Sequence, residues 1–358
     1  MRKWIWLALL MLVVMAVVIS SSGFFQQRYS VVGTRFKEVP PTSRVESSNS
    51  DAVVIPPPFP APKVDSKQLF RHINALNFKR YTQESRDRAR DYLTQSLKKF
   101  GWSPTLQPFD GGVNVFAQRQ GTDPKAGAIL VAAHYDTVAV SPGADDNASG
   151  VAVVLEVARL FGSRATPRTL QVAFFDQEEL GLRGSTAFAA NEAHLENLRG
   201  AIIMDMVGFA CYIAGCQRYP SGLPIIPPTD RGDFLAVVGD LEHLPLLNAF
   251  QQSGQSSLPP VLTLPVPLKG MLMPDTLRSD HAPFWYGGVG AVLLTDTANL
   301  RSPHYHQPSD TPANLDKPFL KGAAQIVVNA TTKLLESRER LETELSNPPP
   351  SFGHPALP

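Results

Sequence analysis

The chain has 358 residues, of which 43% are hydrophobic and 18% are charged. This composition is typical of a folded protein with a large core and excludes a disordered chain. Lys and Arg number 33 and Asp and Glu 32, so the net charge is +1 and we expect no nucleic-acid partner. The two cysteines are too few for a disulfide-stapled mini-protein or a cysteine-rich zinc module.

The N-terminus carries Arg2 and Lys3 before an almost uninterrupted apolar run over 4–19, which small residues follow. This pattern predicts a signal peptide or a signal anchor over 1–23, and the absence of an Ala-x-Ala cleavage site favours the anchor. A buried core helix is the alternative, but the run has no polar face. Because the basic end is expected to stay in the cytoplasm, we predict an extracytoplasmic protein, periplasmic or extracellular, that contacts the membrane through this segment only.

Proline-rich segments lie at both ends of the remaining chain. Residues 24–58 are rich in Ser and Pro and end in a PPPFP run, which predicts a stiffened tether. Residues 341–358 contain a second proline cluster and are predicted to be a disordered tail. The folded domain is therefore expected over 59–340. The sequence carries no signal for an oligomeric state.

The folded domain alternates helical and strand patterns. Thr82 is expected to cap a helix that Gly101 ends, and the run 148–161 is apolar on nearly all sides, which predicts a buried helix. Strands are predicted at 114–119, 128–134, 170–176, 201–205, 234–239 and 291–296, and further helices at 241–252 and 319–337. This alternation predicts an α/β three-layer sandwich, with a mostly parallel central sheet and helices on both faces. Residues 217–230 and 258–276 are rich in proline, and we expect loops there that line a substrate pocket.

Three of the apolar strands run directly into chemically reactive side chains. One ends in His134 and is followed by Asp136, the next leads to Glu178 and Glu179, and a third ends at Asp205. In open α/β sheets the functional site lies beyond the carboxyl ends of the strands. We therefore expect these side chains to meet at one edge of the sheet.

His134 and Asp136 are two residues apart, so in a strand they point the same way. This spacing would supply a metal ligand together with the carboxylate that orients its imidazole. A buried histidine near a turn aspartate is the alternative. The segment PGADDNASG at 142–150 similarly fits a helix cap, but Asp146 would also bridge two cations roughly 3.5–4 Å apart.

Glu178 and Glu179 project in different directions, which suits one metal ligand and one proton acceptor, although acids also favour a helix N-terminus. His306 lies in a loop between prolines, where it is either a surface residue or a nitrogen ligand. The resulting hypothesis has two ions that share Asp146, one bound by His134, Asp146 and Asp205, the other by Asp146, Glu179 and His306. Nitrogen and oxygen ligands fit catalytic Zn²⁺, and Co²⁺ and Mn²⁺ are also compatible.

Six segments resemble, in the same order, those of the co-catalytic zinc aminopeptidases of metallopeptidase family twenty-eight. This family includes bacterial leucine aminopeptidases, glutamate carboxypeptidase II and, more distantly, the glutaminyl cyclases. The segments are HYDT (134–137), PGADDNASG (142–150), DQEELGLRGS (176–185), MDMVG (204–208), SDHAPF (279–284) and YHQPSDT (305–311). The resemblance implies two Zn²⁺ ions per chain and the removal of N-terminal residues from peptides with a free N-terminus. It also implies that Glu178 is the general base, Glu179 a ligand, Asp146 the bridge and Asp136 the carboxylate that orients His134.

The sequence departs from some relatives just before the Ser-Asp-His segment, where those relatives carry a tyrosine that binds the oxyanion. Arg278 or Tyr305 would take this role here. Cys211 and Cys216 lie in the loop after Asp205 and either pair, as an oxidising compartment would allow, or remain buried thiols.

Three other readings remain. Glutaminyl cyclases catalyse an acyl transfer and typically use one zinc, whereas this chain offers ligands for two. Related carboxypeptidases and deacylases normally insert a lid domain after the ligand that corresponds to Asp205, whereas the segment here continues as strand and helix. A receptor ectodomain on a degenerate peptidase fold would lack ligands, and none is missing.

Overall fold

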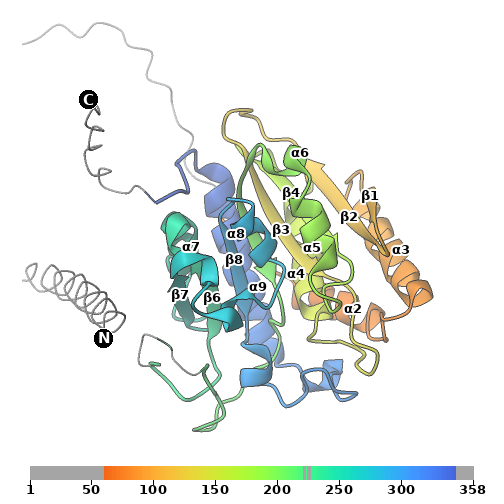
Figure 1. Ribbon diagram of the computed structural model, residues 1–358, viewed down its shortest axis with the longest axis vertical. Helices are drawn as coiled ribbons and strands as arrows, with labels where there is room; N and C mark the ends of the chain where they lie inside the picture. The colour runs from red at the N-terminus through yellow and green to blue at the C-terminus, as the bar shows by residue number, and fades with distance from the viewer. Residues whose placement is uncertain (1–59, 221–222, 224–226, 344–358) are drawn as a thin grey trace, which may run out of the picture. The chain divides into compact units, whose positions relative to one another are not determined.

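An eight-stranded mixed sheet runs through the computed structural model, which describes residues 60–220, 223 and 227–343 (Figure 1). The described residues belong to one compact unit, Pro57–Pro358. The predicted anchor and tether lie outside the described residues, as does the predicted tail beyond 343. Within the described part, no helix has the length and apolar character needed to cross a membrane.

The strands lie in the order β1-β2-β4-β3-β5-β8-β6-β7. They are β1 (Thr105–Phe109), β2 (Gly112–Arg119), β3 (Ala128–His134), β4 (Thr169–Phe175), β5 (Leu198–Met204), β6 (Leu235–Asp240), β7 (Val261–Val266) and β8 (Ala291–Thr295). β4, β3, β5 and β8 are mutually parallel, β6 is antiparallel to β8, and β7 is parallel to β6. β1 and β2 add an antiparallel edge. Every residue of β3 is buried, as expected of a strand with helices on both faces.

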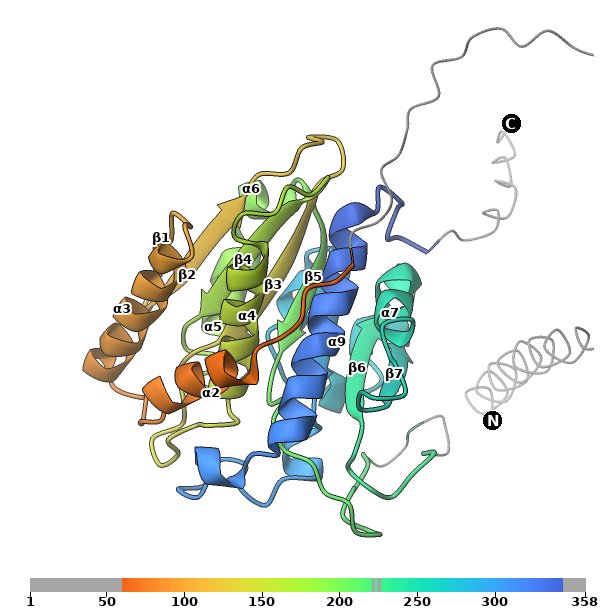
Figure 2. The ribbon, with the colours of Figure 1, turned by 180° about the vertical axis from the view of Figure 1, so that it is seen from behind.

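Helices cover both faces of this sheet, as the two opposite views show (Figures 1 and 2). One face packs against α2 (Ser66–Ala75), α3 (Gln83–Lys99), α4 (Ala148–Phe161), α7 (Leu244–Gln251) and α9 (Lys317–Glu336), and the other against α5 (Arg183–Ala189), α6 (Glu192–Leu195) and α8 (Ala282–Tyr286). The predicted three-layer α/β architecture is confirmed. Its most apolar helix, α4, has the predicted bounds and is buried along most of its length.

The predicted caps agree with the structure. The Thr82 side chain accepts a hydrogen bond from the Ser85 backbone N–H at 3.3 Å and begins α3. Gly101, just after the end of α3, has a φ of +79°, a conformation that costs glycine little.

One predicted loop is wrong. Residues 258–276 contain β7 and the 3-10 turns Pro267–Gly270 and Pro274–Leu277. Proline is tolerated in β7 because β7 is an edge strand that pairs only with β6, so Pro265 removes no hydrogen bond from the interior of the sheet. The sequence pattern does not predict α2, nor the edge strand β1 and the short helices α5, α6 and α8, which have 7, 4 and 5 residues.

Candidate metal centre

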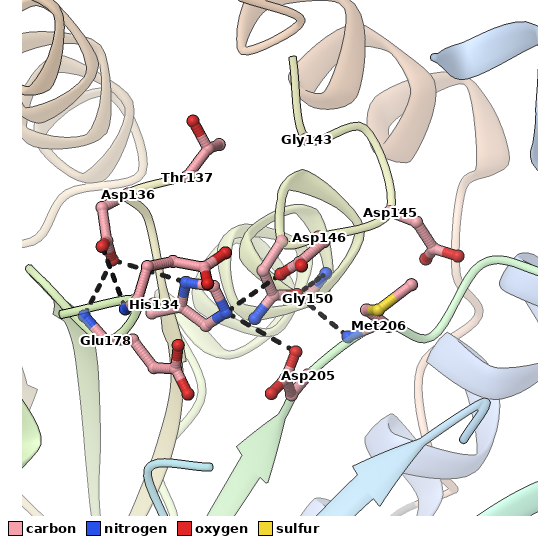
Figure 3. A network of polar contacts seen from close by, with 12 residues as sticks. His134, Asp136, Thr137, Gly143, Asp145, Asp146, Gly150, Glu178, Asp205 and Met206 are labelled. Carbon is pink, nitrogen blue, oxygen red and sulfur yellow. Dashed lines mark hydrogen bonds and ion pairs between the residues drawn. The ribbon is translucent and has the colours of Figure 1, made fainter. Parts of the chain in front are cut away.

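The carboxyl ends of β4, β3 and β5 lie side by side, and predicted site residues gather there, among them His134, Asp136, Asp146, Glu178 and Asp205 (Figure 3). His134 is the last residue of β3, and Asp205 directly follows β5. Glu178 and Glu179 lie in the turn after β4, and His306 comes from the loop before α9. Residues as far apart in the chain as His134 and His306, 172 positions, thus reach one place because parallel strands end at the same edge.

His134 is surrounded by three carboxylates (Figure 3). Its Nε2 lies 3.3 Å from Asp146 Oδ1 and 3.5 Å from Asp205 Oδ1. Its Nδ1 lies 3.4 Å from Asp136 Oδ1. One ring nitrogen therefore faces the carboxylates of the predicted ligands while the other faces the predicted orienting group.

Asp146 presents its two oxygens to two different histidines. Oδ1 faces His134, and Oδ2 lies 3.1 Å from His306 Nε2. His306 Nε2 is also 3.0 Å from Glu179 Oε2. The potential ligand atoms form two groups, and within each group all atoms lie within 4.8 Å of one another. One group comes from His134, Glu178 and Asp205, the other from Asp146, Glu179 and His306.

Asp136 also fixes the turn that carries the two glutamates. Its Oδ1 accepts a hydrogen bond from the Glu178 backbone N–H at 3.0 Å, and its Oδ2 accepts one from the Glu179 N–H at 3.2 Å. One carboxylate thus positions His134 and both glutamates.

Asn147 connects the segment that carries Asp146 to β5. Its side-chain oxygen caps α4 by accepting from the Gly150 N–H at 3.0 Å and also accepts from the Met206 N–H at 3.3 Å. Its amide donates to the Met204 carbonyl at 2.8 Å. Helix capping and the placement of Asp205 therefore use the same side chain.

The two neighbouring glutamates are hard to ionise. Burial raises the pKa of Glu178 well above its usual range, and Asp205 and Asp280 add to the effect. Burial, and then the charge of Asp146, raise the pKa of Glu179 to about 7. Burial thus favours the neutral, protonated form of both glutamates.

For the two histidines, the same surroundings favour the charged form. Burial alone would lower the pKa of His134, but the surrounding carboxylates, Glu178 first, raise it above its usual range. Burial also opposes charge on His306, yet Asp146 and Glu179 raise its pKa to about 10. A concentrated negative charge thus surrounds both imidazoles.

The donor set fits divalent cations. Both ring nitrogens of His134 and Oε1 of Glu179 are buried without a hydrogen-bond partner. Buried polar atoms are rarely left unpartnered, and imidazole nitrogen with carboxylate oxygen is a ligand combination that suits zinc. His134, Asp146 and Asp205 would hold one ion, and Asp146, Glu179 and His306 the other.

A cavity of about 670 Å³ opens beside this centre. Glu178, Glu179 and Asp205 lie on its wall, and the predicted loops contribute to it through, for example, Tyr219 and Met273. Tyr305 and Arg278, predicted for the oxyanion, also line it, and the Arg278 guanidinium donates to the Tyr305 hydroxyl at 3.3 Å. Cys211 and Cys216 form a disulfide in the loop after Asp205.

Sequence reasoning assigned no role to three buried charged residues around the centre. Asp280 belongs to the SDHAPF segment and Asp310 to YHQPSDT, so both motifs offered a signal. Arg80 is fully buried and lies in no motif that the sequence reading had singled out.

The chain is similar to known proteins in both sequence and fold. Residues 114–227 match the family described as "Peptidase family M28". This segment contains every predicted ligand except His306. The uncharacterized protein YfbL of Escherichia coli (strain K12) is 31% identical over 271 residues, which cover 70% of this chain and 80% of YfbL. The chain belongs to peptidase family M28.

Two further proteins show lower sequence identity to this chain. Aminopeptidase YwaD of Bacillus subtilis (strain 168) is 27% identical over 223 residues, 60% of this chain but only 43% of YwaD. The structure of an aminopeptidase from Aneurinibacillus sp. strain AM-1 aligns with a TM-score of 0.60 and 19% identity, over 77% of this chain and 95% of that one, and shows the same fold. The predicted enzyme class, a metallo-aminopeptidase, is confirmed by the family match and by relatives that are named aminopeptidases.

Proposed function

We propose that this M28 peptidase is a two-zinc aminopeptidase that removes N-terminal residues from peptides. The observation that carries the proposal is the position of Asp146, whose two oxygens face His134 and His306 at 3.3 and 3.1 Å. A carboxylate in this position is suited to bridge two ions. Zinc held there would lower the pKa of the attacking water and polarise the carbonyl of the scissile bond.

Glu178 is the proposed general base. It lies at the wall of the cavity, and burial raises the pKa of its carboxyl group, so that it accepts a proton more readily than an ordinary glutamate. It would take a proton from the attacking water and return this proton to the leaving amine. The Asp136 side chain supports this role by fixing the Glu178 backbone N–H.

Two further groups are proposed to bind the substrate. The Tyr305 hydroxyl and the Arg278 guanidinium lie on the cavity wall, where they would donate hydrogen bonds to the carbonyl oxygen as it becomes negative. Glu179 and Asp205 offer acceptors for a positively charged α-amino group, which favours a peptide with a free N-terminus.

The competing activities find less support. A cyclase that works with one zinc needs no second ligand group, whereas Asp146, Glu179 and His306 converge. A lid domain after Asp205 is absent from the described residues, where the chain continues into β6 of the same sheet. An aminopeptidase therefore fits better than either alternative.

We also propose an extracytoplasmic location. The disulfide between Cys211 and Cys216 supports it, because disulfides persist in oxidising compartments. A fusion of residues 1–60 to a reporter enzyme that is active only after export should be active; an inactive fusion that accumulates in the cytoplasm would contradict the proposal.

The decisive test of the activity is a panel of aminoacyl chromogenic substrates, each with a free and an acetylated N-terminus. We expect hydrolysis of the free forms only, loss of activity with a chelator, and recovery on addition of zinc. Hydrolysis of the acetylated forms alone, or chelator-resistant activity, would contradict the proposal.

A further inference from the structure

A fully buried arginine lies behind the segment that carries Asp146. Among the described residues, no carboxylate accepts a hydrogen bond from Arg80, whose side chain donates to main-chain carbonyls instead. Its Nη1 donates to the Pro142 carbonyl and its Nη2 to the Gly143 carbonyl, both at 2.8 Å. Its Nε donates to the Tyr135 carbonyl at 2.6 Å, and its backbone N–H to Thr137 Oγ1 at 2.9 Å. Arg80 therefore joins the segment before Asp146 to the segment after His134.

A buried carboxylate, that of Asp310, accepts hydrogen bonds from backbone N–H groups of the same segment. Asp310 Oδ1 accepts from the Asp145 N–H at 2.8 Å, and Oδ2 accepts from the Asp146 N–H at 3.0 Å. The Asp310 carbonyl accepts from the Ala144 N–H at 3.2 Å. Asp310 lies four residues after His306, so the loop that supplies His306 also contacts the backbone of Asp146.

We infer that Arg80 and Asp310 are positioning residues that together hold the bridging ligand Asp146 in place for two metal ions. The inference rests on the proposed two-zinc function. The Arg80 guanidinium contacts the carbonyls of 142 and 143, and the Asp310 carboxylate contacts the N–H groups of 145 and 146, so this segment lies between two buried charged groups of opposite sign. We call this pair the charge clamp.

The backbone conformation at Gly143 agrees with a segment that is ordered before a metal ion binds. Gly143 has a φ of +64°, and a Cβ there would lie 2.7 Å from Arg80 Nη2 and 2.2 Å from the Asp146 carbonyl oxygen. Only glycine thus permits the close approach of Arg80. Burial lowers the pKa of Arg80 to about 10, opposed by Asp310 and the acids of the site, so the guanidinium stays charged at neutral pH.

The clamp is tested with Arg80→Lys and Asp310→Asn. Lysine cannot reach several carbonyls with a planar fork, and asparagine replaces one acceptor oxygen with a donor that would face an N–H. Removal of groups that orient metal ligands typically weakens metal binding by about 10–100-fold. We expect this loss in zinc affinity, measured by competition of the metal-free protein with a chromogenic chelator, and a changed visible spectrum after substitution with cobalt.

The chain offers a matched control. Arg168 is also a buried guanidinium that donates to main-chain carbonyls, those of Ala126 at 3.0 Å and Leu334 at 3.1 Å, but it precedes β4 and so lies at the opposite end of the sheet from the metal centre. Arg168→Lys should lower the melting temperature yet leave zinc affinity and the cobalt spectrum as in the wild type. If Arg80→Lys and Asp310→Asn behave like Arg168→Lys, the clamp is wrong and the two residues are only structural.

A measurement on the wild-type protein tests the clamp even if the variants fail to fold. If the clamp presets the segment, the Asp145 and Asp146 amides of the metal-free wild type exchange with solvent deuterium slowly, close to the rate of amides in α4. Exchange at the rate of an open loop, with protection only after zinc is added, overturns the inference while leaving the two-zinc function intact. A wild-type protein that binds no zinc overturns the proposed function and the clamp together.

Discussion

The contacts of Glu178 and Glu179 differ although the residues are adjacent. Glu179 Oε2 lies 3.0 Å from His306, whereas Glu178 lies in the group with His134 and Asp205. If Glu178 is the base, Glu178→Gln should keep both zinc ions and the wild-type melting temperature while kcat falls by about 10²–10⁴-fold, the usual contribution of a general base.

Zinc analysis and steady-state kinetics of Glu178→Gln check this prediction, with Glu192→Gln on α6 as a control that should behave as wild type. Loss of one zinc from Glu178→Gln would instead identify Glu178 as a ligand. Unchanged kcat would remove it from the mechanism.

At the same scale, residues at the ends of buried strands could be predicted from sequence, but their supporting contacts could not. His134, Asp205 and the glutamates follow apolar runs, and strand direction alone brings them to one edge. Arg80 contacts backbone carbonyls, which any sequence provides, so no pattern of residue types marks its partners. Tertiary structure was needed to find it.

At the scale of elements, the contact between α2 and α3 contains a buried histidine. His72 of α2 is 4% exposed, and its Nδ1 lies 2.8 Å from the hydroxyl of Tyr92 on α3. Burial, then Arg71 and Arg159, lower the pKa of His72 from 6.5 to about 4. Between these values the unfolded chain binds a proton that the folded chain does not, so the free energy of unfolding decreases as the pH falls through this window.

We expect His72→Gln to reduce this acid destabilisation by about 2 kcal/mol between pH 7 and 4.5, because a shift of one pKa unit is worth about 1.4 kcal/mol. Urea unfolding at several pH values measures it. Tyr92→Phe, which keeps the imidazole, should retain the wild-type slope. An identical slope in His72→Gln would show that the folded chain protonates His72 as easily as the unfolded chain.

Helices and strands were predictable where nearly all of their residues are apolar and buried. α4 and β3 have the predicted bounds because they are apolar on all sides. β7 was mistaken for a loop because proline normally interrupts strands, and only its position at the sheet edge permits it. β1, another edge strand, is largely exposed and contains Pro108, so it also lacks an apolar signal.

At the scale of the molecule, three parallel strands and two loops bring together five side chains that are scattered over more than 170 positions of the sequence. The α/β class and the sheet edge at which they meet were predictable because alternation of strand and helix determines both. For the cavity beside them, the sequence predicted only that two proline-rich segments, 217–230 and 258–276, contribute to its walls. Its walls depend on β6, β7 and β8, whose pairing no local pattern encodes.

The most direct test of the account is the zinc content of the purified wild-type protein and of Asp146→Ala after dialysis against a zinc buffer. Because one carboxylate faces both ligand groups, we predict two zinc ions per chain for the wild type and none for Asp146→Ala. A wild-type protein with a single ion, or an Asp146→Ala variant that still binds two, would contradict the bridged two-zinc centre.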